Sequence, residues 1–293
     1  WTEVQVPHDW AIAGPFDKKW DLQNVAIEQN GEKEKTEKSG RSGALPWIGK
    51  GYYTTTVSLP EDFEAVQLMF DGAMSEPRVY VNGHEAGYWA YGYNAFRIDA
   101  TPYVHAGDNQ IAVSLNNVEE SSRWYPGGGL YRPVTLTVFG GKQHFDDWGL
   151  YVRTVKADNR QARLSIDATL VNDTKPSQVA VALCSPEGKT LQAVMKHVTG
   201  GQYHADIVID RPLLWSPESP YLYDLTLTAY QDKTRKRVHD VLNRRIGIRT
   251  VDVSREHGFR LNGTTRKIRG VCLHHDLGPL GAAVNKAALI RQI

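Results

Sequence analysis

The sequence predicts a mainly β protein: two consecutive antiparallel β-sandwiches, then the first βα unit of a truncated (β/α)8 barrel. One observation is the succession of short runs, alternating apolar with polar residues, that fills residues 51–242. Glycine, proline or asparagine ends most of these runs, which is typical of antiparallel sandwiches. The other observation is the last quarter of the chain, where a hairpin signal precedes two histidines, an aspartate and a helical pattern.

The first sandwich is predicted between residues 51 and 140. Its expected strands are residues 53–59, 66–70, 79–81, 110–115 and 134–139. Pro60, Asp71-Gly72 and Asn82-Gly83 stand at the ends of the first three, where turns are expected. Residues 28–38 form a mixed-charge tract, so we expect a solvated loop there. The last run ends in Gly140-Gly141, which sets the boundary of a first domain, residues 1–140.

A second series of runs predicts a second sandwich in residues 141–251. Its strands are expected to begin near Leu150 and to continue at 164–171, 179–183, 204–209, 222–230 and 238–242. About seven strands in about 110 residues fit an immunoglobulin-like sandwich. Cys184 and Cys272 are far apart and lack CxxC spacing, so both are expected to be buried free thiols.

The last domain, residues 252–293, begins with a predicted hairpin. Phe259 and Leu261 alternate with polar residues up to Asn262-Gly263, a dipeptide that supports the positive φ angles of a tight turn. A second strand is expected over 266–271 and on to His274, His275 and Asp276, before a helical pattern at 282–293. A strand that ends in such groups just before a helix is how a (β/α)8 barrel presents active-site residues.

Only one such unit fits in the sequence, whereas a complete barrel takes roughly 250 residues. The chain starts at Trp1 rather than methionine, so a signal peptide can be neither identified nor excluded. The apolar pattern of Leu289, Ile290 and Ile293 ends without a helix stop signal. We therefore expect a truncated barrel whose tail packs on the sandwiches, on a neighbouring copy or on chain beyond Ile293.

The composition is that of a folded soluble protein, with 41% hydrophobic and 23% charged residues. A net charge of +1 argues against nucleic acid or an anionic membrane as the main partner, because both require a concentrated basic surface. No apolar run approaches the roughly 20 residues of a membrane span. The 8 tryptophans and 14 tyrosines suit sugar faces as well as cores, so their number does not discriminate between these roles.

Several motifs, in order along the whole chain, are similar to those of one enzyme family. They are Pro7-His8-Asp9-Trp10 and residues 51–53, 70–72, 79–83, 121–132, 214–217, 220–225, 247–249 and 259–276. Together they resemble glycoside hydrolase family 2, in particular its β-galactosidases. The resemblance implies a jelly-roll sugar-binding domain, an immunoglobulin-like domain and the start of the catalytic barrel.

The resemblance implies the N-terminal portion of a retaining exo-glycosidase that hydrolyses terminal β-D-galactosides. Such enzymes use two carboxyl groups roughly 5 Å apart. In this family both are glutamates of later barrel strands, so we expect no catalytic residue within this sequence and an inactive segment. A β-glucuronidase or another family 2 glycosidase is the alternative. A non-catalytic carbohydrate-binding sandwich protein is the alternative of another class, against which the predicted barrel unit counts.

The implied partner is a carbohydrate with terminal β-galactose, and a homo-oligomer is compatible with the family. No cofactor is expected in this segment, although the missing barrel could hold a divalent or monovalent cation. A periplasmic or secreted location is slightly favoured over a cytoplasmic one.

Four residues are candidates for substrate binding through the resemblance. His274 matches the histidine that lines the pocket for the terminal sugar, and a neutral imidazole offers a donor and an acceptor to a hydroxyl. Asp276, two residues after His274, is the second candidate for substrate binding. Arg123 and Trp124 belong to a loop that would reach over the barrel mouth, with Trp124 as a sugar platform.

Each candidate also has a structural interpretation. The loop of Arg123 could pack on its own sandwich, and Ser122-Arg123 replaces a carboxylate that some relatives place there. His275 and Asp276 could orient His274 or cap the next segment. A His-His-Asp metal site is disfavoured because adjacent strand residues point in opposite directions. For Asp9 we expect a structural corner in which its carboxylate caps backbone amides.

Overall fold

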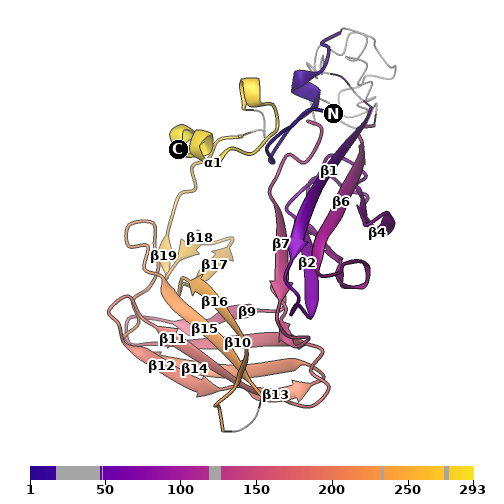
Figure 1. The fold of residues 1–293 in the computed structure, drawn as a ribbon. Helices are drawn as coiled ribbons and strands as arrows, with labels where there is room; N and C mark the ends of the chain where they lie inside the picture. Colours follow the sequence, from indigo (N-terminus) through magenta and orange to yellow (C-terminus); the bar gives the residue numbers. More distant parts are fainter. Residues whose placement is uncertain (18–46, 48, 119–126, 232–233, 274–276) are drawn as a thin grey trace. The chain divides into compact units, whose positions relative to one another are not determined.

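The computed structural model describes residues 1–17, 47, 49–118, 127–231, 234–273 and 277–293. These residues form two compact units (Figure 1). The first unit consists of Trp1–Gly140 together with Cys272–Ile293, and the second of Gly141–Val271. Nearly all regular structure is strand, so the predicted mainly β fold is confirmed.

The first unit is a sandwich of two antiparallel sheets. One sheet has the order β1-β6-β3-β4 and the other β5-β2-β7. The strands are β1 Lys50–Leu59, β2 Ala65–Phe70, β3 Arg78–Val81, β4 His84–Tyr88, β5 Phe96–Asp99, β6 Gly107–Asn116 and β7 Val134–Phe139. The predicted runs all lie within these strands, whereas β4 and β5 were not predicted.

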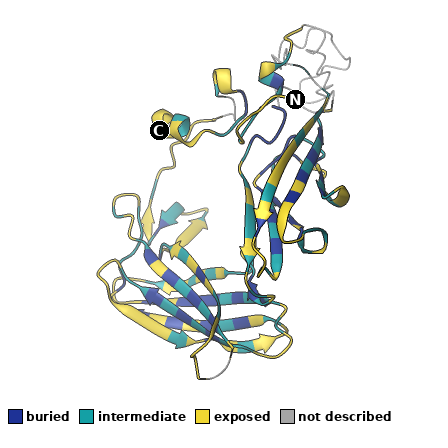
Figure 2. Cartoon of the chain, in the orientation of Figure 1, coloured by how far each residue is buried: buried dark blue, intermediate teal, exposed yellow. Residues whose placement is uncertain are grey.

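The core of the first unit lies between its two sheets because alternate side chains point inward. Along β2, Val66, Leu68 and Phe70 are buried, and the Phe70 ring stacks on that of Phe96 with centroids 4.7 Å apart. Figure 2 shows this alternation as dark and light bands along the strands. The predicted Asn82-Gly83 turn is confirmed, since both residues have positive φ angles of 50° and 83°.

The second unit is also a sandwich of two antiparallel sheets. One sheet has the order β13-β14-β10-β8 with β9 paired to β10, and the other has the order β12-β11-β15-β16. The strands are β8 His144–Phe145, β9 Tyr151–Ala157, β10 Gln161–Val171, β11 Gln178–Cys184, β12 Thr190–Val194, β13 Lys196–Thr199, β14 Gln202–Asp210, β15 Tyr223–Tyr230 and β16 Val238–Ile246. Leu164, Ile166, Val181, Leu225 and Leu227 are among the buried side chains between the sheets.

The predicted hairpin at the Asn262-Gly263 turn is present. It belongs to a sheet of three strands, β17 Val251–Ser254, β18 Gly258–Leu261 and β19 Thr264–Thr265, and the two turn residues have φ angles of 50° and 77°. The prediction that its second strand covers 266–271 is wrong. That strand ends at Thr265, because no described strand pairs with the residues that follow. The barrel unit therefore stays a prediction.

Polar contacts fasten the hairpin to the rest of the second unit, to which it belongs. Asn262 Nδ2 donates to the carbonyl of Trp215 at 3.0 Å, and its backbone amide donates to the carbonyl of Thr250 at 2.9 Å. Arg266 binds both carboxylate oxygens of Glu218, at 2.5 and 2.7 Å. This bidentate pair holds the pKa of Glu218 at about 2, well below its usual range.

Helical structure is scarce in the described part of the chain. It consists of the 3-10 turns η1 Ala11–Ala13, η4 Thr101–Tyr103 and η5 Gly278–Leu280, and of helix α1 Lys286–Gln292. The helix starts later than the predicted residue 282, because Asn285 caps it by accepting a hydrogen bond from the Ala288 amide at 3.0 Å. No helix among these is long and apolar enough to cross a membrane.

The tail packs on the first unit through Ala282 rather than through α1. Ala282 is buried in a small cluster with Met74 and Tyr131. By contrast, Ile290 is 63% exposed and Ile293 fully exposed, so packing on the sandwich does not cover these two residues within the described chain. That a neighbouring copy or chain beyond Ile293 covers them stays a prediction. No other described segment lies over that face of the helix.

The expectation that both cysteines are buried is wrong, since neither is fully buried. Cys184 is half-buried on β11, but Cys272 is exposed, and both are free. Cys272 lies in the stretch after β19, which has no strand partner among the described residues.

Candidate functional site

The predicted substrate-binding residues lie outside the described residues. Arg123 and Trp124 belong to the undescribed segment 119–126, and His274, His275 and Asp276 are the undescribed segment 274–276. Their predicted roles therefore stay predictions. Gly127 and Leu277, which directly follow the two segments, are described.

The buried carboxylate of Asp9 hydrogen-bonds to the backbone shortly after each of these two segments. Asp9 is 2% exposed. Its Oδ1 accepts the backbone amides of Ala11 and Gly128, each at 3.0 Å, and its Oδ2 accepts that of Ala282 at 2.8 Å. Asp9 therefore caps backbone amides as predicted, and it does so for three segments that are far apart in the sequence. We call this arrangement the Asp9 joint.

The segments of the Asp9 joint approach each other too closely for larger residues. A Cβ atom on Gly127, whose φ is +77°, would lie 2.3 Å from the Cβ of Ala282. A Cβ atom on Gly281, whose φ is +59°, would lie 2.4 Å from Asp9 Oδ2. The Val284 amide also donates to the carbonyl of Tyr131 at 2.8 Å. Glycine is therefore required at both positions by conformation and by space.

The Asp9 joint brings together the ends of the two segments that carry the candidate residues. Gly127 directly follows the segment of Arg123 and Trp124, and it contacts Ala282 in the stretch after Asp276. Sequence patterns did not predict this contact, because it joins residues more than 150 positions apart. The glycines at 127 and 281 were the available signal.

The corner around Asp9 is a structural element, as expected. His8 Nδ1 lies 2.8 Å from the hydroxyl of Tyr53, and the His8 amide donates to the carbonyl of Leu130. Burial lowers the pKa of His8, against the opposing effect of Asp9, and burial raises the pKa of Tyr53. Both groups are therefore held neutral near pH 7, which suits a buried corner.

Two hollows of the first unit differ in character. One, of about 1030 Å³, is lined by core side chains such as Leu68, Phe70 and Val113 and by the exposed N-terminal residues 1–4. The other, of about 710 Å³, lies over strands β1, β6, β3 and β4 and is lined by tyrosines and charged side chains.

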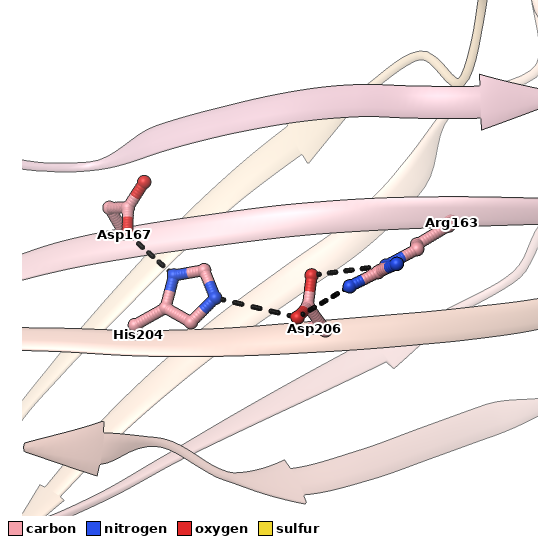
Figure 3. Close-up of polar contacts among 4 residues, drawn as sticks. All are labelled: Arg163, Asp167, His204 and Asp206. Carbon is pink, nitrogen blue, oxygen red and sulfur yellow. Dashed lines mark hydrogen bonds and ion pairs between the residues drawn. The ribbon is translucent and has the colours of Figure 1, made fainter.

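A polar network lies on the exposed face of β10 and β14 in the second unit (Figure 3). Arg163 Nη2 lies 3.0 Å from Asp206 Oδ2, and His204 is placed between Asp167, at 2.7 Å, and Asp206, at 3.6 Å. These charges pair with one another, and exposed pairs contribute little to stability. No cluster of three or more His, Cys, Asp or Glu side chains that could hold a metal is found among the described residues.

The network makes a testable prediction about His204. Its hydrogen bond to Asp167 raises the pKa of His204. Asp167→Asn should lower that pKa toward the ordinary value, as measured by NMR titration of the ring protons. Asp224→Asn, in the opposite sheet, is the control and should leave it unchanged. An unaltered His204 pKa in Asp167→Asn would contradict this account.

The raised pKa of His204 also predicts how the stability of the fold depends on pH. Because the folded-state pKa lies above the unfolded value, the pair stabilises the fold fully below the unfolded pKa. This contribution is lost as the pH rises through the folded pKa.

The match to known families defines the class of the chain. Residues 1–138 match the model described as glycosyl hydrolases family 2, sugar binding domain, and residues 143–249 match that of glycosyl hydrolases family 2. The two matches follow the two sandwiches and together span most of the sequence. The chain belongs to glycosyl hydrolase family 2, as its motifs predicted.

Two curated relatives have different names at the same identity. The chain is 34% identical to the β-galactosidase BoGH2A of Bacteroides ovatus, over 100% of its own length and 33% of that protein. It is also 34% identical to a putative β-glucuronidase of Formosa agariphila, over 99% of its length and 26% of that protein. The chain thus spans about a third or less of these relatives.

Solved structures show the same arrangement of strands. A family 2 member from Bacteroides cellulosilyticus superposes with a TM-score of 0.83 at 28% identity, and covers 100% of this chain and 37% of its own. A β-glucuronidase from Bacteroides uniformis, covalently bound to cyclophellitol-6-carboxylate aziridine, has a TM-score of 0.78 at 27% identity. That match covers 100% of this chain and 34% of the other.

Proposed function

We propose that this chain is the N-terminal portion of a retaining exo-glycosidase that hydrolyses terminal β-D-galactosides. The observation that carries the proposal is the 34% identity to a protein named β-galactosidase across the whole chain. The Asp9 joint supports it, because it connects the ends of the two segments that would form opposite walls of a sugar pocket.

In this proposal the chain binds and orients the sugar, and chain beyond Ile293 performs the bond cleavage. Two glutamates of the later barrel would act as acid/base and as nucleophile, forming a glycosyl-enzyme intermediate. His274 would exchange hydrogen bonds with a hydroxyl of the terminal sugar. Trp124 would stack on the sugar ring, and Arg123 would bond a hydroxyl or a supporting carboxylate. Asp9 would hold the segments that follow these residues.

A β-glucuronidase is the second candidate, because a protein named putative β-glucuronidase is equally similar. The two sugars differ in the configuration at C4 and at C6, the carbon outside the ring, which is a hydroxymethyl group in galactosides and a carboxylate in glucuronides. A pocket selective for glucuronides needs a cationic group at that point, since a buried carboxylate must be paired.

The experiment compares two substrates and two proteins. We expect the complete protein that contains this sequence to release the aryl group from an aryl β-galactoside, and to act far less on the matching β-glucuronide. The 293-residue chain should release neither above a buffer control, because it would lack both glutamates.

Each outcome has a definite meaning. Preference for the glucuronide would replace the first candidate by the second. No turnover of either substrate by the complete protein would leave another family 2 glycosidase or a non-catalytic carbohydrate-binding function. Turnover by the 293-residue chain would contradict the assignment of catalysis to chain beyond Ile293.

A further inference from the structure

The outer face of the sheet β1-β6-β3-β4 carries a hollow that the proposed site does not use. It has a volume of about 710 Å³ and lies within the size range of small-molecule sites. The residues that line it include Tyr52, Arg78, Tyr80, Tyr88, Ser114 and Asn116, together with the exposed Trp1 at the start of the sequence. We call it the sheet trough.

The strand register places the side chains of the sheet trough in one row. Tyr52 of β1 is opposite Ser114 of β6, which is opposite Arg78 of β3, which is opposite Tyr88 of β4. Opposite residues of a sheet share a face. This face is the outer one, because Tyr52 is 60% and Tyr88 is 43% exposed.

Small residues form the floor of the sheet trough. The floor is formed by Ser114 and Ala112, which occupy outward positions on β6. The wall on one side is Tyr52 of β1, and the wall on the other side is Arg78 and Tyr80 of β3. Neighbouring strands lie about 4.8 Å apart, so the two walls are separated by about 10 Å. A flat ring can lie in a space of this width above a floor of small side chains.

Two contacts orient the Arg78 side chain in the wall on β3 and β4. The Arg78 guanidinium lies over the Tyr88 ring, 4.7 Å from its centroid, and Nη1 donates to Glu85 Oε1 at 2.9 Å. A guanidinium that is already stacked and hydrogen-bonded has less conformational freedom to lose when a ligand binds. The Tyr52 ring, across the trough, presents an exposed face.

A strained carboxylate residue closes one end of the sheet trough. Glu76 has a φ of +48°, which is uncommon for a residue other than glycine. Asn116 holds Glu76 in place through two hydrogen bonds. Its side-chain Nδ2 donates to Glu76 Oε2 at 2.9 Å, and its backbone amide donates to the Ser75 carbonyl at 2.8 Å. Strain that surrounding contacts maintain is a feature of ligand-binding positions.

We propose that the sheet trough binds neutral pyranose units of an oligosaccharide. Tyrosine rings suit the C–H faces of a sugar, and Arg78, Glu76 and Asn116 offer donors and acceptors for its hydroxyls. Lys50 and Arg78 balance Glu76 and Glu85, and a balanced set of charges favours a neutral polyhydroxyl ligand over a polyanion.

The position of the sheet trough along the chain indicates which sugars it receives. Asn116, at its strained end, precedes by a few residues the segment that contains Arg123 and Trp124. On the basis of the proposed function, the terminal sugar would occupy the pocket of that segment. The sheet trough would then bind sugars further along the same oligosaccharide.

The face in Figure 3 provides a contrast within the same chain. There, the charges of Arg163, Asp167, His204 and Asp206 pair with one another across two strands. In the sheet trough, an aromatic ring stands at each end of the cross-strand row, and small side chains lie between them. The two outer faces therefore differ in chemistry, and we propose the sugar site for one of them.

Binding is tested with the 293-residue chain and β-1,4-linked galactotetraose as the probe. NMR titration should shift the signals of Tyr52 and Tyr88, and Tyr52→Ala should weaken binding by about tenfold or more, since a ring anchor is lost. Tyr151→Ala is the matched control, because Tyr151 is 62% exposed on β9 in the other unit. It should bind the probe as the unaltered chain does.

Other outcomes would overturn the proposal. They are the absence of saturable binding, equal weakening by Tyr151→Ala, or a change of oligomeric mass in Tyr52→Ala without any change in sugar binding. The last result would show that a second copy occupies the face.

The same variant separates this proposal from the proposed function. In the complete protein, Tyr52→Ala should lower kcat/KM for galactotetraose relative to that for an aryl β-galactoside, because only the longer substrate reaches the sheet trough. An unchanged ratio would contradict the sheet trough. If the complete protein cleaves no galactoside while the 293-residue chain still binds the probe at Tyr52, only the proposed function fails.

Discussion

Asp9→Ala is expected to destabilise the first unit by about 3–5 kcal/mol, since buried amides lose their acceptor and each unsatisfied donor costs about 1–3 kcal/mol. The amides concerned are those of Ala11, Gly128 and Ala282. Calorimetry should show an earlier unfolding transition for the first unit. The second unit has its own core, so its transition should be unaffected.

Asp9→Asn tests the contact with the tail by itself. The side-chain amide has one acceptor oxygen, so it can keep the bonds to Ala11 and Gly128 while its NH2 group faces the Ala282 amide. We expect a smaller loss of stability than in Asp9→Ala. In the complete protein, kcat/KM should still fall markedly, because the chain after residue 276 would shift.

Asp62→Asn, in an exposed turn before β2, is the control for both variants and should change neither quantity. If Asp9→Asn keeps the kcat/KM of the unaltered protein, Asp9 contributes to stability alone and does not position the candidate site.

Local patterns predicted those parts of the fold that local forces determine. The alternation of β2 and β6 follows from one buried and one exposed face, and the Asn262-Gly263 turn follows from backbone conformation. Strands β4 and β12 were missed because most of their residues are exposed and no apolar alternation marks them. They exist because a neighbouring strand supplies their hydrogen bonds.

The stretch after Thr265 illustrates the opposite error. Its alternating pattern predicts a strand, yet a strand forms only where another strand pairs with it, and none of the described strands does. The candidate site has a similar limit. The corner at Asp9 could be predicted from a local motif, whereas its bond to Ala282 joins opposite ends of the sequence. Periodicity carries no information about such a pair.

The contact between Gly127 and Ala282 gives the second large expected effect. Gly127→Ala should destabilise the first unit by about 2–4 kcal/mol, because it adds the cost of a positive φ to a clash in a packed site. Gly83→Ala is the control for the cost of the positive φ. Gly83 has a φ of +83°, and a Cβ atom there would meet nothing within 4 Å. It should therefore report the cost of the backbone conformation without the clash.

Ala282→Gly, added to Gly127→Ala, should restore the part of the stability that the clash removes. The added Cβ at 127 would lie 2.3 Å from the Cβ that this second change deletes. Calorimetry of both single variants and the double variant should thus give a coupling energy of roughly 1–3 kcal/mol in favour of the double variant. Additive effects would mean that the two residues are not in contact. The tail would then not be fastened beside Gly127, and the Asp9 joint would not connect the two candidate segments.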